Sequence, residues 1–106
     1  MTSGGAGFAR CDGMEHRATE GFWRAYEELP SGVRNRAHKQ FSLLKTNPQH
    51  PSLQFKKIGE ARGQSLWSAR VTLNYRALAL KREDGFLWFW IGDHESYDGL
   101  ISRWHA

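Results

Sequence analysis

The sequence predicts a small α+β domain, in which an N-terminal helical hairpin packs on a curved four-stranded antiparallel sheet and a C-terminal helix follows. Three observations lead to this prediction. Apolar residues recur at helical spacing in the first half of the chain, alternate with polar residues in the second half, and return to helical spacing at the end.

The chain has 106 residues, of which 40% are hydrophobic, so it has room for one domain with a modest core. Residues 1–13 are rich in glycine and small residues without periodicity, and we expect a disordered N-terminal extension. Residues 14–106 form the expected single domain, and Met14 could be an alternative start. The five tryptophans are spread over several predicted elements, and we expect most of them in the core: Trp23, Trp67, Trp88, Trp90 and Trp104.

Two helices are predicted before the sheet. Thr19 is a suitable N-cap for the first helix, whose apolar stripe is Phe22, Trp23, Tyr26 and Leu29. Residues 29–32 break this helix, and a second one is expected over residues 33–45. Its stripe is Val33, Ala37, Phe41 and Leu44, while four basic residues point elsewhere: Arg34, Arg36, Lys39 and Lys45.

Strands are predicted over residues 53–58, 66–72, 75–81 and 86–91, with a further short strand conceivable at residues 15–18. Residues 82–85 form a hairpin signal, and residues 86–91 are apolar on both faces, which is typical of a central strand. The last helix follows from the spacing of Tyr97, Leu100, Ile101 and Trp104.

The segment 66–80 carries the most functional information. Its odd positions, from Trp67 to Ala79, form a nearly unbroken apolar face that includes Leu73, and its even positions include Arg70 and Arg76. Arginine suits phosphate recognition because its planar fork donates paired hydrogen bonds and stays charged. Lys56 and Lys57 adjoin on the preceding strand, where alternation allows only one of them to share a face with the arginines.

Four groups of residues could converge into a site that cleaves RNA. Histidine ordinarily titrates near neutrality, so His94, which follows the central strand, could act as base or acid. Arg70, Arg76 and Lys56 could hold the phosphate in its transition state. Tyr97, one turn beyond His94, could donate a proton or stack on a base.

Each of these residues also has a purely structural interpretation. His94 could cap the last helix, and Tyr97 could belong to the core. Both lysines could be a solvated strand edge, and the arginines could pair internally with acidic residues, namely Glu60, Asp93 or Glu95.

Composition and charge limit the kinds of ligand, cofactor and cellular location that fit this sequence. Fifteen basic residues against 11 acidic ones give a charge of +4, which is compatible with nucleic acid or an acidic protein partner. Cys11 is the only cysteine, so no intramolecular disulfide or cysteine-based zinc site can form. We see neither a signal peptide nor a membrane-spanning run, and no metal-ligand spacing among the histidines, so we expect a cytoplasmic protein without cofactor.

Taken together, residues 14–104 resemble the RelE/ParE superfamily of bacterial toxins. The resemblance rests on the order and spacing of four motifs: Phe22-Trp23-x-x-Tyr26-x-x-Leu29-Pro30, Asn47-Pro48-x-His50-Pro51-Ser52-Leu53-x-Phe55-Lys56, Trp67-Ser68-Ala69-Arg70-Val71-Thr72-x-x-Tyr75-Arg76, and Trp90-Ile91-Gly92-x-His94-x-x-Tyr97-Asp98. It implies the same helical hairpin and four-stranded sheet, and a toxin silenced by a cognate antitoxin.

RelE-like members are ribosome-dependent endoribonucleases that cut mRNA and so inhibit translation. The resemblance therefore implies a metal-independent mRNA interferase, with Arg70, Arg76, His94 and Tyr97 as catalytic candidates and Lys56 and Lys57 as further RNA-binding candidates. ParE-like members share the fold but inhibit DNA gyrase without the nuclease residues, and His94 together with the arginines favours the nuclease branch. An inactive protein that only binds its antitoxin is the third possibility.

Overall fold

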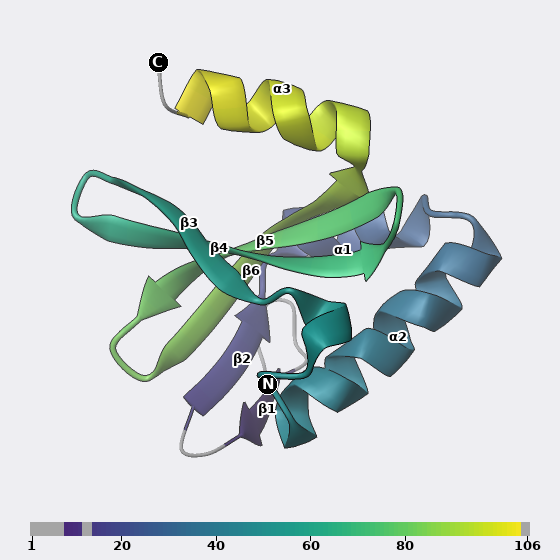
Figure 1. The fold of residues 1–106 in the computed structure, drawn as a ribbon, viewed down its shortest axis with the longest axis horizontal. Coiled ribbons are helices and arrows are strands. Elements are labelled where there is room, and N and C mark those ends of the chain that lie inside the picture. The colour runs from purple at the N-terminus through teal and green to yellow at the C-terminus, as the bar shows by residue number, and fades with distance from the viewer. Residues whose placement is uncertain (1–7, 12–13, 105–106) are drawn as a thin grey trace.

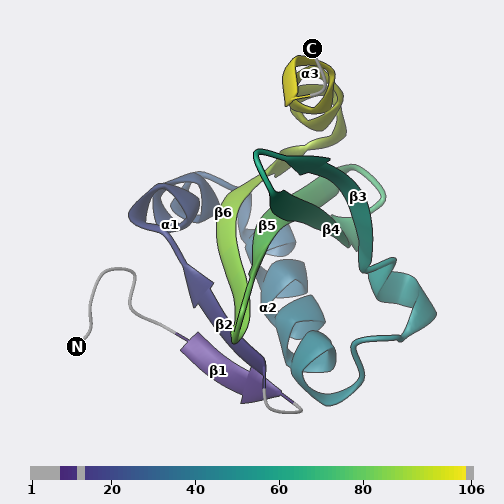
Figure 2. The same cartoon turned by 90° about the vertical axis from the view of Figure 1, so that its left-hand side faces the viewer.

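The computed structural model describes residues 8–11 and 14–104, and it combines one sheet with three α-helices (Figures 1 and 2). In chain order the elements are β1 (Phe8–Cys11), β2 (Met14–Ala18), α1 (Glu20–Glu27), α2 (Ser31–Thr46), the 3₁₀ turn η1 (Pro51–Leu53), β3 (Lys56–Ala61), β4 (Gln64–Thr72), β5 (Tyr75–Arg82), β6 (Gly85–Asp93) and α3 (His94–Trp104). The α+β class and the three predicted helices are thus confirmed.

The sheet differs from the prediction of four antiparallel strands. It has six strands in the order β1-β2-β6-β5-β4-β3, and it is mixed because β2 runs parallel to β6. Gly85 of β6 lies opposite Glu15 of β2 in the register. The two strands can approach this closely only because Gly85 has no side chain, since a Cβ there would lie 1.8 Å from the Glu15 backbone oxygen. The short strand considered at residues 15–18 is present as β2, whereas β1 was not predicted, because four residues are too few for alternation to establish a strand.

Strand β1 lies within the segment that we expected to be a disordered extension. Phe8–Cys11 pairs antiparallel with β2, so that expectation is wrong for these four residues. Residues 1–7 and 12–13 of the predicted extension lie outside the described residues.

The first two helices begin where the sequence predicted, within two residues. The Thr19 hydroxyl accepts a hydrogen bond from the Phe22 backbone N–H at 3.0 Å, which confirms Thr19 as the N-cap of α1. Residues 28–30 link α1 to α2, and α2 is slightly longer than predicted at both ends. Helix α1 packs on β6 and helix α2 packs on β4.

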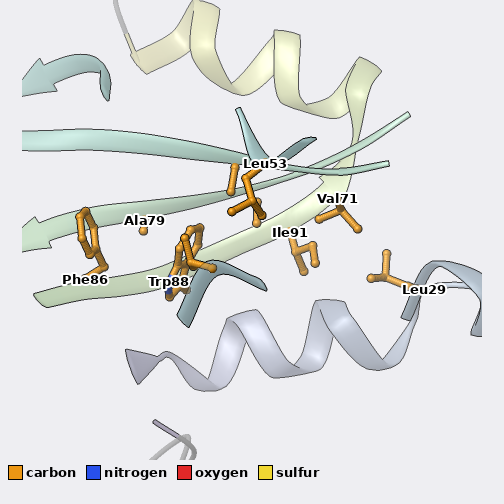
Figure 3. Packing of buried hydrophobic residues seen from close by; sticks show 10 residues of the cluster. Leu29, Leu53, Val71, Ala79, Phe86, Trp88 and Ile91 are labelled. Atoms are coloured by element: carbon orange, nitrogen blue, oxygen red, sulfur yellow. The ribbon is translucent and has the colours of Figure 1, made fainter. Parts of the chain in front are cut away.

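The main core lies between these helices and one face of the sheet, which we call the helix-covered face. Its buried cluster includes Val71, Ala79, Phe86, Trp88 and Ile91, with Leu29 and Leu53 from the connecting segments. Figure 3 shows these side chains along the strands, on the side of the sheet away from α3. The predicted apolar face of β4 and β5 is confirmed except at Leu73, which lies in the turn between them and is 76% exposed.

The opposite face of the sheet carries the alternate residues of the same strands. Leu66, Ser68 and Leu78 lie on it and are completely buried. Helix α3 contacts the sheet through β6 and β5 and lies apart from α1 and α2 (Figure 2).

Candidate functional site

Arg70 and Arg76 lie directly opposite each other on β4 and β5. Their neighbours Ala69, Val71 and Ala77 belong to the core cluster, so alternation places both arginines on the other face of the sheet. We call this surface the arginine face. It also carries Ser68 and Trp90, by the register of β4, β5 and β6.

This cross-strand pair of cations has no compensating carboxylate among the described residues. In the part of the chain that the structure describes, no ion pair joins either arginine to Glu60, Asp93 or Glu95. Glu60 instead pairs with Lys57 at 3.4 Å, and Asp93 accepts a hydrogen bond from the Ser96 N–H. The Nε atom of Arg76 is buried and has no hydrogen-bond partner. Like charges directly opposite in a sheet are destabilising, so this arrangement favours an anionic ligand over a structural role.

Tyr97 and His94 extend this surface from the first turn of α3. The Arg76 guanidinium carbon lies 5.3 Å from the centre of the Tyr97 ring, and the His94 ring is 5.9 Å from the same ring. Tyr97 also contacts Trp90, with ring centres 6.3 Å apart. Thus Tyr97 packs on the arginine face rather than in the main core, and the structure brings Arg76, Tyr97 and His94 together.

His94 is held by its backbone rather than acting as the cap of α3. Its N–H donates to the Asn74 carbonyl oxygen at 2.6 Å, which ties the start of α3 to the β4–β5 turn. The cap is Asp93, whose Oδ1 accepts from the Ser96 N–H at 2.7 Å. Hydrogen bonds from the Ser96 backbone and side chain lower the pKa of Asp93, because they stabilise its charged form.

The His94 ring remains accessible to a substrate. Its side chain is 48% exposed, and its Nδ1 lies 3.3 Å from the Asp98 carboxylate, one turn along α3. With Nδ1 engaged by Asp98, Nε2 is the nitrogen left available for proton transfer.

The two candidate lysines are separated by the sheet. Lys56 pairs with Ser68 and therefore shares the face of Arg70, whereas Lys57 pairs with Trp67 on the opposite face. Lys57 also forms an ion pair with Glu60. The structure thus groups Lys56 with the arginines and does not place Lys57 with them.

Trp90 is a residue of this surface that sequence reasoning assigned to the core with the other tryptophans. It is half-buried on the arginine face, and its ring lies over Gly92, where an added Cβ would come within 2.6 Å of the indole. Alternation alone predicts the same face for Trp88 and Trp90, which are two residues apart. A register irregularity between them places the two rings on opposite faces, and the sequence carried no signal for it. Of the other described tryptophans, Trp88 is buried and Trp67 packs against the core, while Trp23 lines the groove described next.

A second candidate site lies on the helix-covered face. It is a mainly apolar cavity of about 270 Å³ between the helices α1 and α2 and the sheet, which we call the hairpin groove. Phe22, Trp23, Tyr26 and Phe41 contribute its aromatic lining, and Arg17, His38 and Lys45 contribute basic groups. No acidic residue is among those lining it.

The described residues offer neither a metal site nor a membrane-spanning helix. Within residues 8–11 and 14–104, no group of three or more His, Cys, Asp or Glu side chains could hold a metal ion. None of the helices in the described part of the chain is both long and apolar enough to cross a membrane.

Comparison with known families places the chain among toxins. Residues 31–99, well over half of the chain, match the family described as "ParE-like toxin domain". The protein belongs to this family, which confirms the resemblance to the RelE/ParE superfamily and makes it a toxin of the toxin–antitoxin class.

The fold has a similar counterpart of known structure. It is similar to a chain in the crystal structure of the archaeal RelE–RelB complex from Pyrococcus horikoshii OT3, with a TM-score of 0.61 and 14% sequence identity. The similarity covers 76% of this chain and 94% of that one. Comparison with curated proteins gave no match.

Proposed function

We propose that this toxin is a ribosome-dependent endoribonuclease, which cleaves mRNA without a metal or organic cofactor and thereby inhibits translation. The observation that carries the proposal is the unpaired cross-strand couple of Arg70 and Arg76, next to an accessible histidine. Two cations opposite each other without a carboxylate destabilise the sheet, whereas a phosphodiester supplies the missing negative charge.

The reaction divides among residues of the arginine face and of the first turn of α3. The 2′-oxygen attacks the phosphorus while the bond from phosphorus to the 5′-oxygen breaks. His94 takes the proton from the 2′-hydroxyl, and the departing 5′-oxygen takes a proton from the Tyr97 hydroxyl or from water. Arg70 and Arg76, with Lys56 beside them, stabilise the charge that develops on the phosphate. Tyr97 and Trp90 offer aromatic surfaces on which unpaired bases can stack.

The test compares single variants after brief induction in cells, with primer-extension mapping of mRNA ends. His94→Ala and Arg76→Ala should abolish the cleavage pattern, while Lys57→Ala on the opposite face should retain it. The catalytic assignment fails if His94→Ala and Arg76→Ala stay folded and remain as toxic as the parent.

We further propose that a cognate antitoxin binds the hairpin groove. The RelE of the similar solved structure was crystallised with RelB, and the groove here joins aromatic lining to basic groups without an acidic one. These features suit an amphipathic helix with an apolar stripe and acidic flanks. Co-purification with the product of a neighbouring gene, lost on Trp23→Glu but not on Arg76→Ala, is the expected result.

Gyrase inhibition is the second candidate function, because the matching family is described as ParE-like. On that alternative the toxin binds gyrase and leaves mRNA intact. Induction of a DNA-damage response without new mRNA ends would favour gyrase inhibition, and new mRNA ends without such a response would favour the nuclease.

A further inference from the structure

Gln40 joins three elements on the helix-covered face. Its Nε2 donates to the Arg70 carbonyl oxygen at 2.9 Å and to the Ser52 carbonyl oxygen at 3.2 Å. The side chain comes from the middle of α2 and is only 7% exposed. Both hydrogens of one buried amide are thus used to connect α2 with η1 and β4.

The bond to Arg70 lies at an irregular point of β4. The β4–β5 register shifts between Arg70 and Thr72, immediately after the pair that Arg70 forms with Arg76. Such bulges interrupt the ladder of backbone hydrogen bonds and re-aim the neighbouring side chain. At this point Gln40 gives the Arg70 carbonyl a hydrogen-bond donor from outside the ladder.

The hydrogen bond from Gln40 to Arg70 matters because of the arginine pair. Arg70 and Arg76 repel each other across β4 and β5, and a bulge gives the strand freedom to yield. The Gln40 amide restrains the Arg70 backbone from the opposite face of the sheet, where no substrate competes for it.

We infer that Gln40 is a positioning residue for RNA cleavage, which fixes the Arg70 backbone so that its guanidinium stays opposite Arg76. The inference rests on the proposed nuclease function. Gln40 touches no reacting atom, and its effect on cleavage passes through its bond to the Arg70 backbone.

A double-mutant cycle tests this route. Gln40→Met keeps the length of the side chain but removes both donors. The matched control is Gln64→Met, the same substitution at the start of β4, where the side-chain oxygen has no partner in the described structure. Cleavage of mRNA on purified ribosomes is measured for each variant alone and combined with Arg70→Ala, at a temperature where circular dichroism shows all of them folded.

The expected result is a fall in kcat of roughly tenfold for Gln40→Met, since small misplacements of a catalytic group have effects of this order. In the Arg70→Ala background the same substitution should change kcat less than about twofold, because coupled residues are not additive. Gln64→Met should stay near the parent in both backgrounds. An equal loss with and without Arg70 would overturn the inference, because Gln40 would then act through general stability.

Hydrogen exchange separates this inference from the proposed function. If the parent chain cuts no ribosome-bound mRNA, the nuclease proposal fails, but the restraint on Arg70 can still be measured. Gln40→Met should accelerate amide exchange at residues 70–72 relative to Gln64→Met. Unchanged exchange there would overturn the inference whatever the activity of the parent.

Discussion

Acidification is expected to destabilise the protein through His16, a buried residue of β2. His16 is 4% exposed, and its Nδ1 accepts a hydrogen bond from the Trp88 indole N–H at 3.1 Å. Its ring stacks on Phe86 with centres 5.6 Å apart. Burial lowers the pKa of His16, and the nearby Lys45 lowers it further. The native state therefore holds this imidazole neutral.

The sign of the pH effect follows from the lowered pKa. Above the ordinary histidine pKa of 6.5, the imidazole is neutral in both the folded and the unfolded state, and the hydrogen bond from Trp88 contributes fully to stability. As the pH falls, the unfolded state takes up the proton first, and the contribution is lost as the pH passes through the lower folded-state pKa. Protonation turns Nδ1 into a donor facing the Trp88 N–H.

The hydrogen bond sets the size of the effect. A buried donor left without its acceptor costs about 1–3 kcal/mol. For a domain of about 100 residues, 2 kcal/mol corresponds to a fall in Tm of roughly 8–16 °C. We expect a loss of this order between pH 7.5 and pH 5.

Thermal unfolding followed by circular dichroism at several pH values provides the assay. His16→Asn retains an oxygen acceptor for Trp88 but cannot titrate, so its Tm should depend less on pH than that of the parent. His38→Asn, at an exposed position of α2, controls for the loss of any histidine. The reasoning is refuted if the parent and His16→Asn lose the same Tm on acidification.

Three further predictions follow from the sheet. Gly85→Ala should lower the free energy of unfolding by about 1–3 kcal/mol or more, because the added methyl group forces β2 away from β6. Gly99→Ala in α3 should leave the free energy of unfolding unchanged or raise it, because an added Cβ there meets no other atom. Urea unfolding measures both variants. Lys56→Ala should weaken binding of single-stranded RNA more than Lys57→Ala in a fluorescence titration, because only Lys56 shares the arginine face; equal losses would contradict this assignment. Gly92→Ala should displace the Trp90 indole and so lower the affinity for RNA with little change in Tm. An unchanged affinity would show that Trp90 does not take part in RNA binding.

The sequence predicted those parts of the fold that strong local patterns determine. The N-cap Thr19, the alternation in β4 and β5, and the final amphipathic helix all lie in the structure as expected. The same alternation placed Arg70 and Arg76 on one face and showed that only one of Lys56 and Lys57 could join them.

The features that could not be predicted from the sequence depend on contacts between distant segments. Pairing of β2 with β6 joins residues about 70 positions apart and depends on a missing side chain at Gly85. Gln40 gave no local signal either, because its two acceptors lie 12 and 30 residues further along the chain. The role of Asp93 as the cap of α3 was hidden by the more conspicuous His94 beside it.

The two candidate sites lie on opposite faces of the same sheet, and this separation has an evolutionary consequence. A substitution that removes Arg76 or His94 leaves the hairpin groove, with its aromatic lining, unchanged. On the proposed assignments, such a chain would no longer cleave mRNA, yet it would still compete for antitoxin. Degenerate copies of this gene would then become decoys that withdraw antitoxin from intact toxins. Selection could act on Arg76 and His94 separately from the groove, but not on Arg70, which also lines the groove.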